Sequence, residues 1–359
     1  MVLILIKEYG YEYDATIDKK LWVKSKGKVT YDKLWGALCL RSGRDAFKVI
    51  AKEYKPSKVL MPALACESMI LPFKMNGHNI CYYRLKETYS IDLDYFRGQI
   101  EKGEQKIIFL YMDYFGIPAI KDTELEKLRF EYPNMIFVED RTHNLILEKK
   151  RKFVPEYTVA SLRKWINVPD GGLLWTDLPI EKNVLKKDTS FSELRMKAQC
   201  MRNSYFKQED DSIKSEYRKI FSTVSDIIDK DADASRMSMY AYELAKHTNW
   251  DKLKKQREKN FNQLVKILKE KNINIIQNSA ECSSLYVPFL VYKRDSKQMA
   301  LSSLGIFNTI IWPLSYEQKE VCSVAKYTEE HMLAAPCDQR YTEEDMIYIG
   351  EKIVRFINE

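Results

Sequence analysis

The stretch Lys106–Tyr114, KIIFLYMDY, decides the fold. It begins with an apolar run of the length of one buried strand, and the polar residues Asp113 and Tyr114 follow directly. The segment 135–141, MIFVEDR, repeats this arrangement, with Asp140 after its apolar run. Short buried strands that end in polar residues are typical of a mostly parallel sheet covered by helices, and ligands bind at the carboxyl edge of such a sheet.

Further strands and helices extend this pattern towards the N-terminus. Apolar runs predict strands at Val59–Met61 and Asn79–Tyr83, and apolar residues at helical spacing predict helices at Asp45–Tyr54 and Glu124–Tyr132. Strands that alternate with helices in this way predict an α/β fold.

The sequence changes in character after about residue 176. It becomes charged and helix-rich. Trp250–Lys271 is predicted to form one long amphipathic helix, and Thr342–Asn358 is predicted to form the last helix of the chain. Short strands are expected between these two helices, at Ile273–Ile276, Leu285–Tyr292 and Thr309–Trp312. We therefore expect an N-terminal segment and large domain over residues 1–245, and a smaller α+β domain over 246–359.

Composition and charge argue against several classes of protein, among them nucleic-acid-binding, disulfide-rich and membrane proteins. The 359 residues include 58 basic and 51 acidic side chains, a net charge of +7, and the basic residues are scattered among acidic ones. This distribution does not predict nucleic-acid binding. The seven cysteines are odd in number and form no C-x-x-C pair, so we expect neither a disulfide framework nor a metal site. The apolar start, residues 1–6, is too short for a signal peptide or membrane span, and we expect a cytoplasmic protein without membrane contact.

A first candidate site lies where a loop enters the helix predicted from Asp45. Ser42 is a possible helix cap, Gly43 leaves the backbone N–H groups open, and Arg44 adds a positive charge. The start of a helix attracts anions, so this loop is a candidate phosphate site. An ordinary capped helix is the alternative.

A second candidate follows the strand at 135–138. Asp140 stands at its carboxyl end and His143 three residues later. A carboxylate in this position can keep a ring nitrogen protonated, because its negative charge stabilises the protonated form, and His143 can bond a ring substituent. The alternative is that both residues only support a loop.

The third candidate is a lysine. Lys164 has a hydroxyl residue, Ser161, three positions before it, and the pair Gly171-Gly172 follows before another short strand. These residue types are the ones that a Schiff-base lysine in a phosphate-binding pocket needs nearby. The amine attacks an aldehyde, the hydroxyl forms a hydrogen bond to phosphate, and the glycines let the backbone come close. A surface lysine is the alternative.

In this order, the three groups resemble the fold-type-I pyridoxal-phosphate (PLP) enzymes, and most of all the DegT/DnrJ/StrS family of sugar aminotransferases. Three further stretches carry the resemblance, namely MPALAC at 61–66, YFGIP at 114–118 and RMS at 236–238. It extends from Ser42 to the C-terminal helix. It implies a three-layer α/β/α large domain, a smaller α+β C-terminal domain and PLP as cofactor.

The resemblance also implies roles for individual residues. Lys164 would hold the cofactor aldehyde and carry protons, Asp140 would bind the pyridine nitrogen, and His143 would contact the ring oxygen. The implied phosphate cradle consists of Gly43, Arg44 and Ser161, and Ser42 is a further predicted cofactor-binding residue. The implied reaction transfers an amino group from a glutamate-like amino acid to a nucleotide-linked keto-sugar.

Substrate contacts are predicted at Asp113, Tyr114 and Arg340, and Arg163 and Arg236 are further candidates for the charges of a nucleotide. The sequence departs from the family at Cys66, where an aromatic residue usually stacks on the cofactor, and at Asp113, where a histidine is usual.

These departures leave alternatives open. One is another PLP reaction, by an amino-acid aminotransferase, lyase or dehydratase. The other is a non-catalytic PLP-binding regulatory protein. The resemblance further implies a homodimer, with the helix-rich stretch after residue 176 as the expected source of residues for the partner's site.

Overall fold

The computed structural model describes residues 7–10, 12–16, 21, 33–101, 106–146, 152–180, 185–276 and 284–358. Within them the large sheet contains β2 (Lys33–Leu34), β3 (Ala37–Leu40), β4 (Lys58–Pro62), β5 (Asn79–Tyr83), β6 (Ile107–Met112), β7 (Met135–Asp140), β8 (Tyr157–Ser161) and β9 (Gly172–Trp175). Their spatial order is β2-β3-β9-β8-β7-β6-β4-β5. The strands from β8 to β5 are mutually parallel, and β9 runs antiparallel between β8 and β3.

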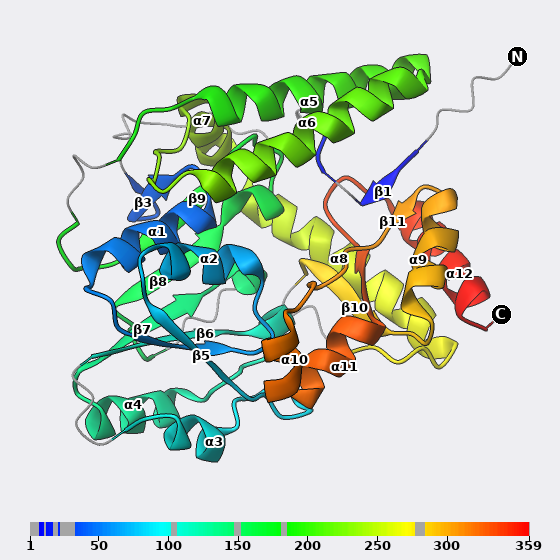
Figure 1. The fold of residues 1–359 in the computed structure, drawn as a ribbon. Coiled ribbons are helices and arrows are strands. Elements are labelled where there is room, and N and C mark those ends of the chain that lie inside the picture. Colours follow the sequence, from blue (N-terminus) through cyan, green and yellow to red (C-terminus); the bar gives the residue numbers. More distant parts are fainter. Residues whose placement is uncertain are drawn as a thin grey trace, which may run out of the picture.

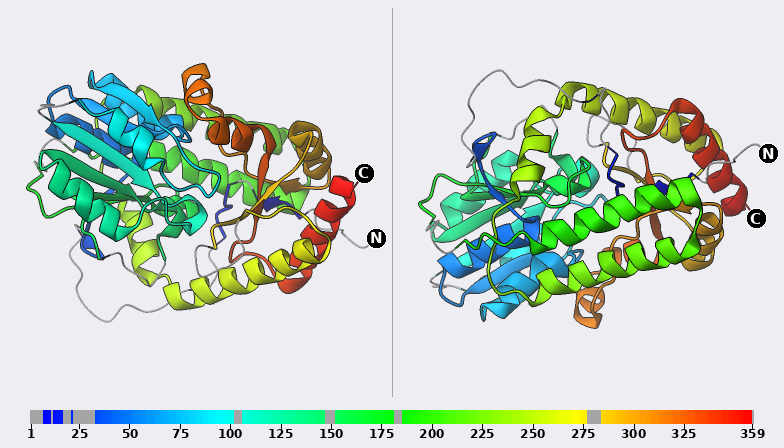
Figure 2. Two further views of the ribbon diagram at one scale, coloured as in Figure 1. Left: turned by 90° about the horizontal axis from the view of Figure 1, so that it is seen from below. Right: turned by 90° about the horizontal axis from the view of Figure 1, so that it is seen from above.

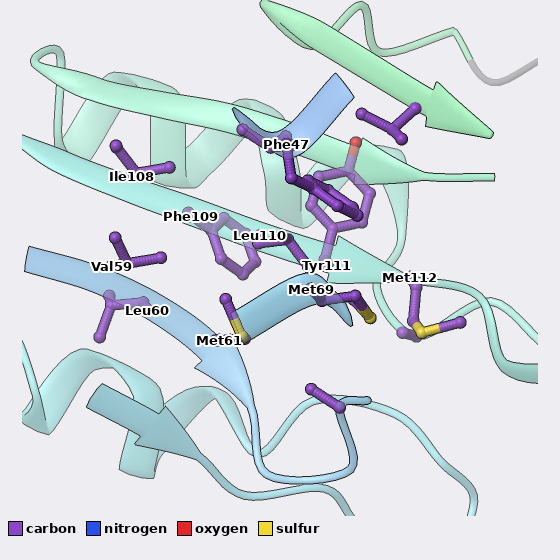
Figure 3. Packing of buried hydrophobic residues seen from close by; sticks show 14 of the residues in the cluster. Phe47, Val59, Leu60, Met61, Met69, Ile108, Phe109, Leu110, Tyr111 and Met112 are labelled. Carbon is purple, nitrogen blue, oxygen red and sulfur yellow. The ribbon is translucent and has the colours of Figure 1, made fainter. Parts of the chain in front are cut away.

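Helices cover both faces of this sheet, which confirms the predicted three-layer α/β fold. Helices α1 (Gly43–Glu53) and α2 (Glu67–Met75) lie on one face, and α3 (Leu93–Gly98) and α4 (Asp122–Glu131) on the other (Figure 1). Strand β6 is buried along its whole length, as its continuous apolar sequence predicts. Figure 3 shows side chains of β4 and β6 packed together with Phe47 of α1 in this core.

Two long helices, α5 (Ser190–Gln208) and α6 (Asp211–Lys230), form an antiparallel pair that we call the α5–α6 hairpin. Glu209 turns the chain with a left-handed φ of 55°, and the Asp210 side chain caps α6. The two helices lie side by side and extend from the large sheet towards the C-terminal elements (Figure 2). Helix α7 (Met239–His247) follows.

The C-terminal part forms a second core. The elements of the C-terminal part are α8 (Trp250–Glu270), β10 (Tyr286–Leu290), α9 (Arg294–Ser303), β11 (Ile306–Phe307), α10 (Tyr316–Val321), α11 (Ser323–His331), β12 (Met332–Pro336) and α12 (Glu343–Asn358). Strands β10 and β12 pair antiparallel. The predicted strands at 273–276 and 309–312 are wrong, since only isolated bridges form there, at Ile275 and Thr309.

The N-terminal segment packs on the C-terminal part. Strand β1 (Tyr9–Gly10) pairs with β11, Tyr9 lies in the second core, and Lys7 forms an ion pair with Asp345. The division at residue 245 stays a prediction, and this segment crosses it.

Residues 1–6 lie outside the described residues. Across the described part of the chain, no helix is both long and apolar enough to cross a membrane.

Candidate functional site

A pocket lies at the carboxyl edge of the large sheet. In the parallel register Met112 of β6 pairs with Asp140 of β7, and Asp140 pairs with Val159 of β8, so these strands end at the same edge. Met112, Asp140 and Ser161 line the pocket. Strand β3 runs in the same direction as β8, and helix α1 therefore begins at this edge too, with Ser42 in the pocket wall.

Lys164 lines the pocket from the short helix η4 (Leu162–Lys164), which follows β8 directly. Its side chain is half-buried. Burial lowers the pKa of the Lys164 amine, while the nearby Cys66 and Asp140 raise it in part. A lowered pKa leaves more of the amine unprotonated, which is the form that attacks an aldehyde.

Asp140 is buried at the end of β7, and its Oδ1 accepts the backbone N–H of Thr142 at 2.7 Å. Burial raises the pKa of this carboxyl group, and the hydrogen bonds from Thr142 and the charge of Lys164 oppose that shift. A buried carboxylate in a pocket wall is stabilised by a cationic N–H placed against it. Asp140 therefore suits a protonated ring nitrogen.

His143 lies in η3 (Thr142–Asn144), is 1% exposed, and its ring stacks on Phe115 with the centroids 5.3 Å apart. Burial, with a smaller contribution from Lys164, lowers the pKa of His143 to about 3, so the ring is neutral at pH 7. Its Nδ1 accepts the N–H of Phe115 at 3.2 Å, which puts the proton of the neutral ring on Nε2. Trp312, 5.9 Å from His143 between ring centroids, also lines the pocket.

The start of α1 is shaped by the glycine pair that follows Lys164. The Ser42 hydroxyl accepts the N–H of Asp45 at 3.1 Å and caps the helix. A Cβ atom on Gly172 would lie 2.0 Å from the carbonyl carbon of Ser42, so only glycine lets β9 pass this close. The close approach predicted for the glycine pair thus occurs, and its partner is the backbone before α1.

Cationic side chains gather beside the start of α1. Arg44 forms an ion pair with Asp229, and Arg195 of α5 forms one with Glu12 at 2.5 Å. The Nε atoms of Arg44 and Arg195 are buried and have no hydrogen-bond partner among the described residues. Two orphaned guanidinium donors beside a helix start match the needs of a phosphate group. The pocket therefore fits PLP: a phosphate end at α1, a carboxylate for the ring nitrogen, and a lysine.

The predicted cofactor residues come together in this pocket. Its wall includes Ser42, Gly43, Arg44, Cys66, Asp140, His143, Ser161 and Lys164. Sequence reasoning missed Phe191, Arg195 and Ser225 of the hairpin and Trp312 of the C-terminal part, which line it as well. No local signal singles these four residues out. The helix-rich stretch expected to reach a partner's site lines the pocket of its own chain.

Asp113 and Tyr114 are placed differently from the prediction. The Asp113 carboxylate accepts the N–H of Ala119 at 3.0 Å and the amide of Asn144 at 3.3 Å. The fully buried Tyr114 hydroxyl donates to the carbonyl oxygen of Leu64. Neither residue is part of the pocket wall that the described residues form. Both support the loops behind the pocket.

A second cavity of about 400 Å³ adjoins the pocket, and Arg163 and Lys164 line both. Arg340 lines the second cavity, with its guanidinium 2.8 Å from Asp338 and 4.3 Å from the Tyr13 ring centre. Although Asp338 is buried, Arg340 holds the pKa of its carboxyl group below the usual value. The walls of this cavity also carry Glu12, Arg218 and Arg257. Arg236, also considered from the sequence, is not among its described lining residues.

No family model matches this sequence, and no curated protein matches it. Solved structures do. Helicobacter pylori PseC, an aminotransferase involved in pseudoaminic acid biosynthesis, matches with a TM-score of 0.66 and 15% identity over 98% of this chain and 100% of its own. Bacillus subtilis NtdA with bound cofactor PMP matches with a TM-score of 0.60 and 15% identity, over 90% and 73%.

A third match is DesI in the presence of its TDP-sugar product, with a TM-score of 0.64 and 13% identity over 89% of this chain and 80% of its own. The mostly parallel sheet with helices on both faces (Figure 1) agrees with the predicted fold, whereas neither the order of the strands nor strand β8 was predicted. The chain therefore has the fold of the DegT/DnrJ/EryC1/StrS aminotransferases.

Proposed function

We propose that this protein is a PLP-dependent aminotransferase that moves an amino group from an amino acid such as glutamate onto a nucleotide-linked keto-sugar. One observation carries the proposal: Lys164, Asp140, His143 and the capped start of α1 all line one pocket at the carboxyl edge of the sheet. Their chemistry matches the aldehyde, ring nitrogen, ring oxygen and phosphate of PLP.

When bound, PLP supplies an electron sink for the carbon that bears the amino group. The residues of the chain do the rest. Lys164 would hold the cofactor through its aldehyde, and the free Lys164 amine would carry the proton to and from that carbon. Asp140 keeps the proton on the ring nitrogen, and His143 offers its Nε2–H. Ser42, Ser161 and Arg44 hold the phosphate end.

The second cavity supports the choice of a large anionic substrate. It opens next to Lys164, and Arg163, Arg257 and Arg340 in its wall are cations beyond those at the start of α1. Guanidinium groups bind diphosphates well because their donors are arranged as a planar fork. DesI, which shares the fold, was solved with a TDP-sugar product.

The half-reaction tests the proposal. The protein is loaded with PLP and mixed with glutamate, and the absorbance of the bound cofactor is followed. We expect conversion to the pyridoxamine form, and we expect nucleotide-linked amino sugars to give the same change in the reverse direction. Rapid reaction of free amino acids with no reaction of any amino sugar would replace the sugar assignment by an amino-acid aminotransferase. A bound cofactor inert to every amine would indicate a non-catalytic protein.

A further inference from the structure

The α5–α6 hairpin places one cation, Arg195, where the sequence showed no site. Arg195 lies in the pocket wall, yet it belongs to a different element from the predicted phosphate cradle. Its side chain is 2% exposed, and its guanidinium lies 5.8 Å and 5.1 Å from the ring centres of Phe191 and Phe221. The two aromatic rings and the helix hold the group in a fixed position.

Arg195 lies among several charged groups: Glu12 is its ion-pair partner, and the buried Asp170 also interacts with its charge. Three guanidinium groups interact here: partial burial lowers the pKa of Arg163 to about 10, the charges of Arg195 and Arg44 add to this shift, and Glu12 opposes it. Glu12 is shared, at 2.5 Å from Arg195 and 3.6 Å from Arg163. Of these three arginines, only Arg44 forms an ion pair with Asp229 among the described residues.

Like charges gathered in a buried place cost free energy unless an anion compensates them. The orphaned Nε of Arg195 is also a buried donor that lacks an acceptor among the described residues. A doubly charged phosphate at the start of α1 would satisfy both needs. A neutral acceptor would bond the Nε–H but would bring no negative charge to the guanidinium groups.

We propose that helix α5 supplies Arg195 as a phosphate-binding residue for the cofactor, in the same chain that carries Lys164. The inference rests on the proposed function, since it takes PLP as the occupant. It assigns the hairpin a binding role, since Arg195 of α5 lines the same pocket as Gly43 and Arg44 at the start of α1.

The test compares two aldehydes that differ only in the phosphate. Dissociation constants of PLP and of pyridoxal are measured by the absorbance of the imine that each forms with the protein. For Arg195→Gln we expect PLP to bind about 10- to 100-fold more weakly, the range of a lost charge-assisted hydrogen bond, with pyridoxal binding unchanged. Arg195→Lys keeps the charge and should give an intermediate loss.

Two controls separate binding from support of the fold. Arg202→Gln removes an equally buried arginine of α5 that is paired with Glu8 and does not line the pocket. Glu12→Gln removes the acidic partner of Arg195 and leaves its charge. We expect both to keep the wild-type preference for PLP over pyridoxal.

Three results would overturn the role of Arg195. One is an equal loss of both aldehydes in Arg195→Gln and Arg195→Lys, another is no loss in either variant, and the third is a loss of the PLP preference in Glu12→Gln that equals the loss in Arg195→Gln. A wild-type protein that forms no imine with either aldehyde would refute the proposed function instead.

Discussion

At the scale of single residues, burial acts on Lys164 and Asp140 in opposite directions. It lowers the pKa of the amine and raises that of the carboxyl group, because both shifts favour the neutral form. Each group also interacts with the other, which partly restores the charged forms. Perturbed pKa values of this kind are typical of functional sites.

We predict that Lys164 is the lysine that holds PLP. After reduction with borohydride and peptide mapping, the label should be found on Lys164, and Lys164→Ala should lose the absorbance of the imine while keeping the fold. Among the described residues, only this lysine combines the pocket, the preceding Ser161 and the Asp140 carboxylate. A label on another lysine would contradict the assignment.

Asp140→Ala should slow turnover by about 100-fold or more while imine formation persists, because the ring nitrogen loses the charge that keeps it protonated. Stopped-flow absorbance separates the two steps. Asp140→Asn, which keeps the shape of the side chain, should be slowed in the same way. Near-normal turnover in both variants would leave Asp140 with a structural role only.

The lowered pKa of His143 predicts that the stability of the cofactor-free protein depends on pH. Its pKa falls from 6.5 to about 3 on folding, so below pH 6.5 the unfolded chain takes up a proton that the folded chain does not. This contribution therefore lowers the free energy of unfolding by about 1.4 kcal/mol per pH unit between pH 6.5 and 3.

Urea unfolding at pH 7.5 and pH 5 tests this effect. From pH 7.5 to pH 5, His143→Gln should lose about 2 kcal/mol less stability than the wild type. His331→Gln, in α11 away from the pocket, serves as the control. The same loss in wild type and His143→Gln would show that the ring is protonated in the folded protein.

At the scale of elements, the contact between β9 and the start of α1 couples the lysine loop to the phosphate end. Gly172→Ala should destabilise the protein by about 1–3 kcal/mol and weaken PLP binding, because the new Cβ would collide with the backbone of Ser42. Gly98→Ala is the matched control, since a Cβ there meets nothing within 4 Å. Thermal unfolding and cofactor titration measure both effects, and equal behaviour of the two variants would refute the coupling.

At the scale of the whole molecule, the hairpin runs from the large sheet towards the C-terminal elements (Figure 2), and its residues line the pocket of their own chain. The homodimer stays a prediction from the family resemblance, and light scattering should give twice the chain mass of 42.4 kDa. Within such a dimer we predict that Lys164 and Arg195 of each site come from one chain. A species of 42.4 kDa that is fully active would contradict the dimer.

Mixed dimers test whether Lys164 and Arg195 of each site come from the same chain. Lys164→Ala and Arg195→Glu chains carrying different tags are co-expressed, and the doubly tagged dimer is assayed at limiting PLP. If each site belongs to one chain, both sites of the mixed dimer are defective and activity is not restored. Recovery towards half of the wild-type activity would mean that the hairpin reaches the partner's site.

Much of the fold and part of the site could be predicted from the sequence. The strands around Ile108 and Phe137 are continuous apolar runs, because parallel strands are buried on both faces. Asp140 directly follows an apolar run, so its place at the carboxyl edge follows from local sequence, whereas strand β8, which brings Lys164 to the same edge, was not predicted. Strand β12, MLAAP, was not predicted, since its residues have no strong strand preference and its conformation depends on pairing with β10.

The sequence by itself determined the α/β class, strands that end at the site, and the lysine, carboxylate and helix start as candidates for it. Only the tertiary structure decided that Arg195 and Trp312 complete the pocket and that Asp113 and Tyr114 lie behind it. The physical reason is the range of the interactions. Strand burial and helix capping depend on neighbours in the chain, whereas the hairpin reaches the sheet edge only through packing between distant segments.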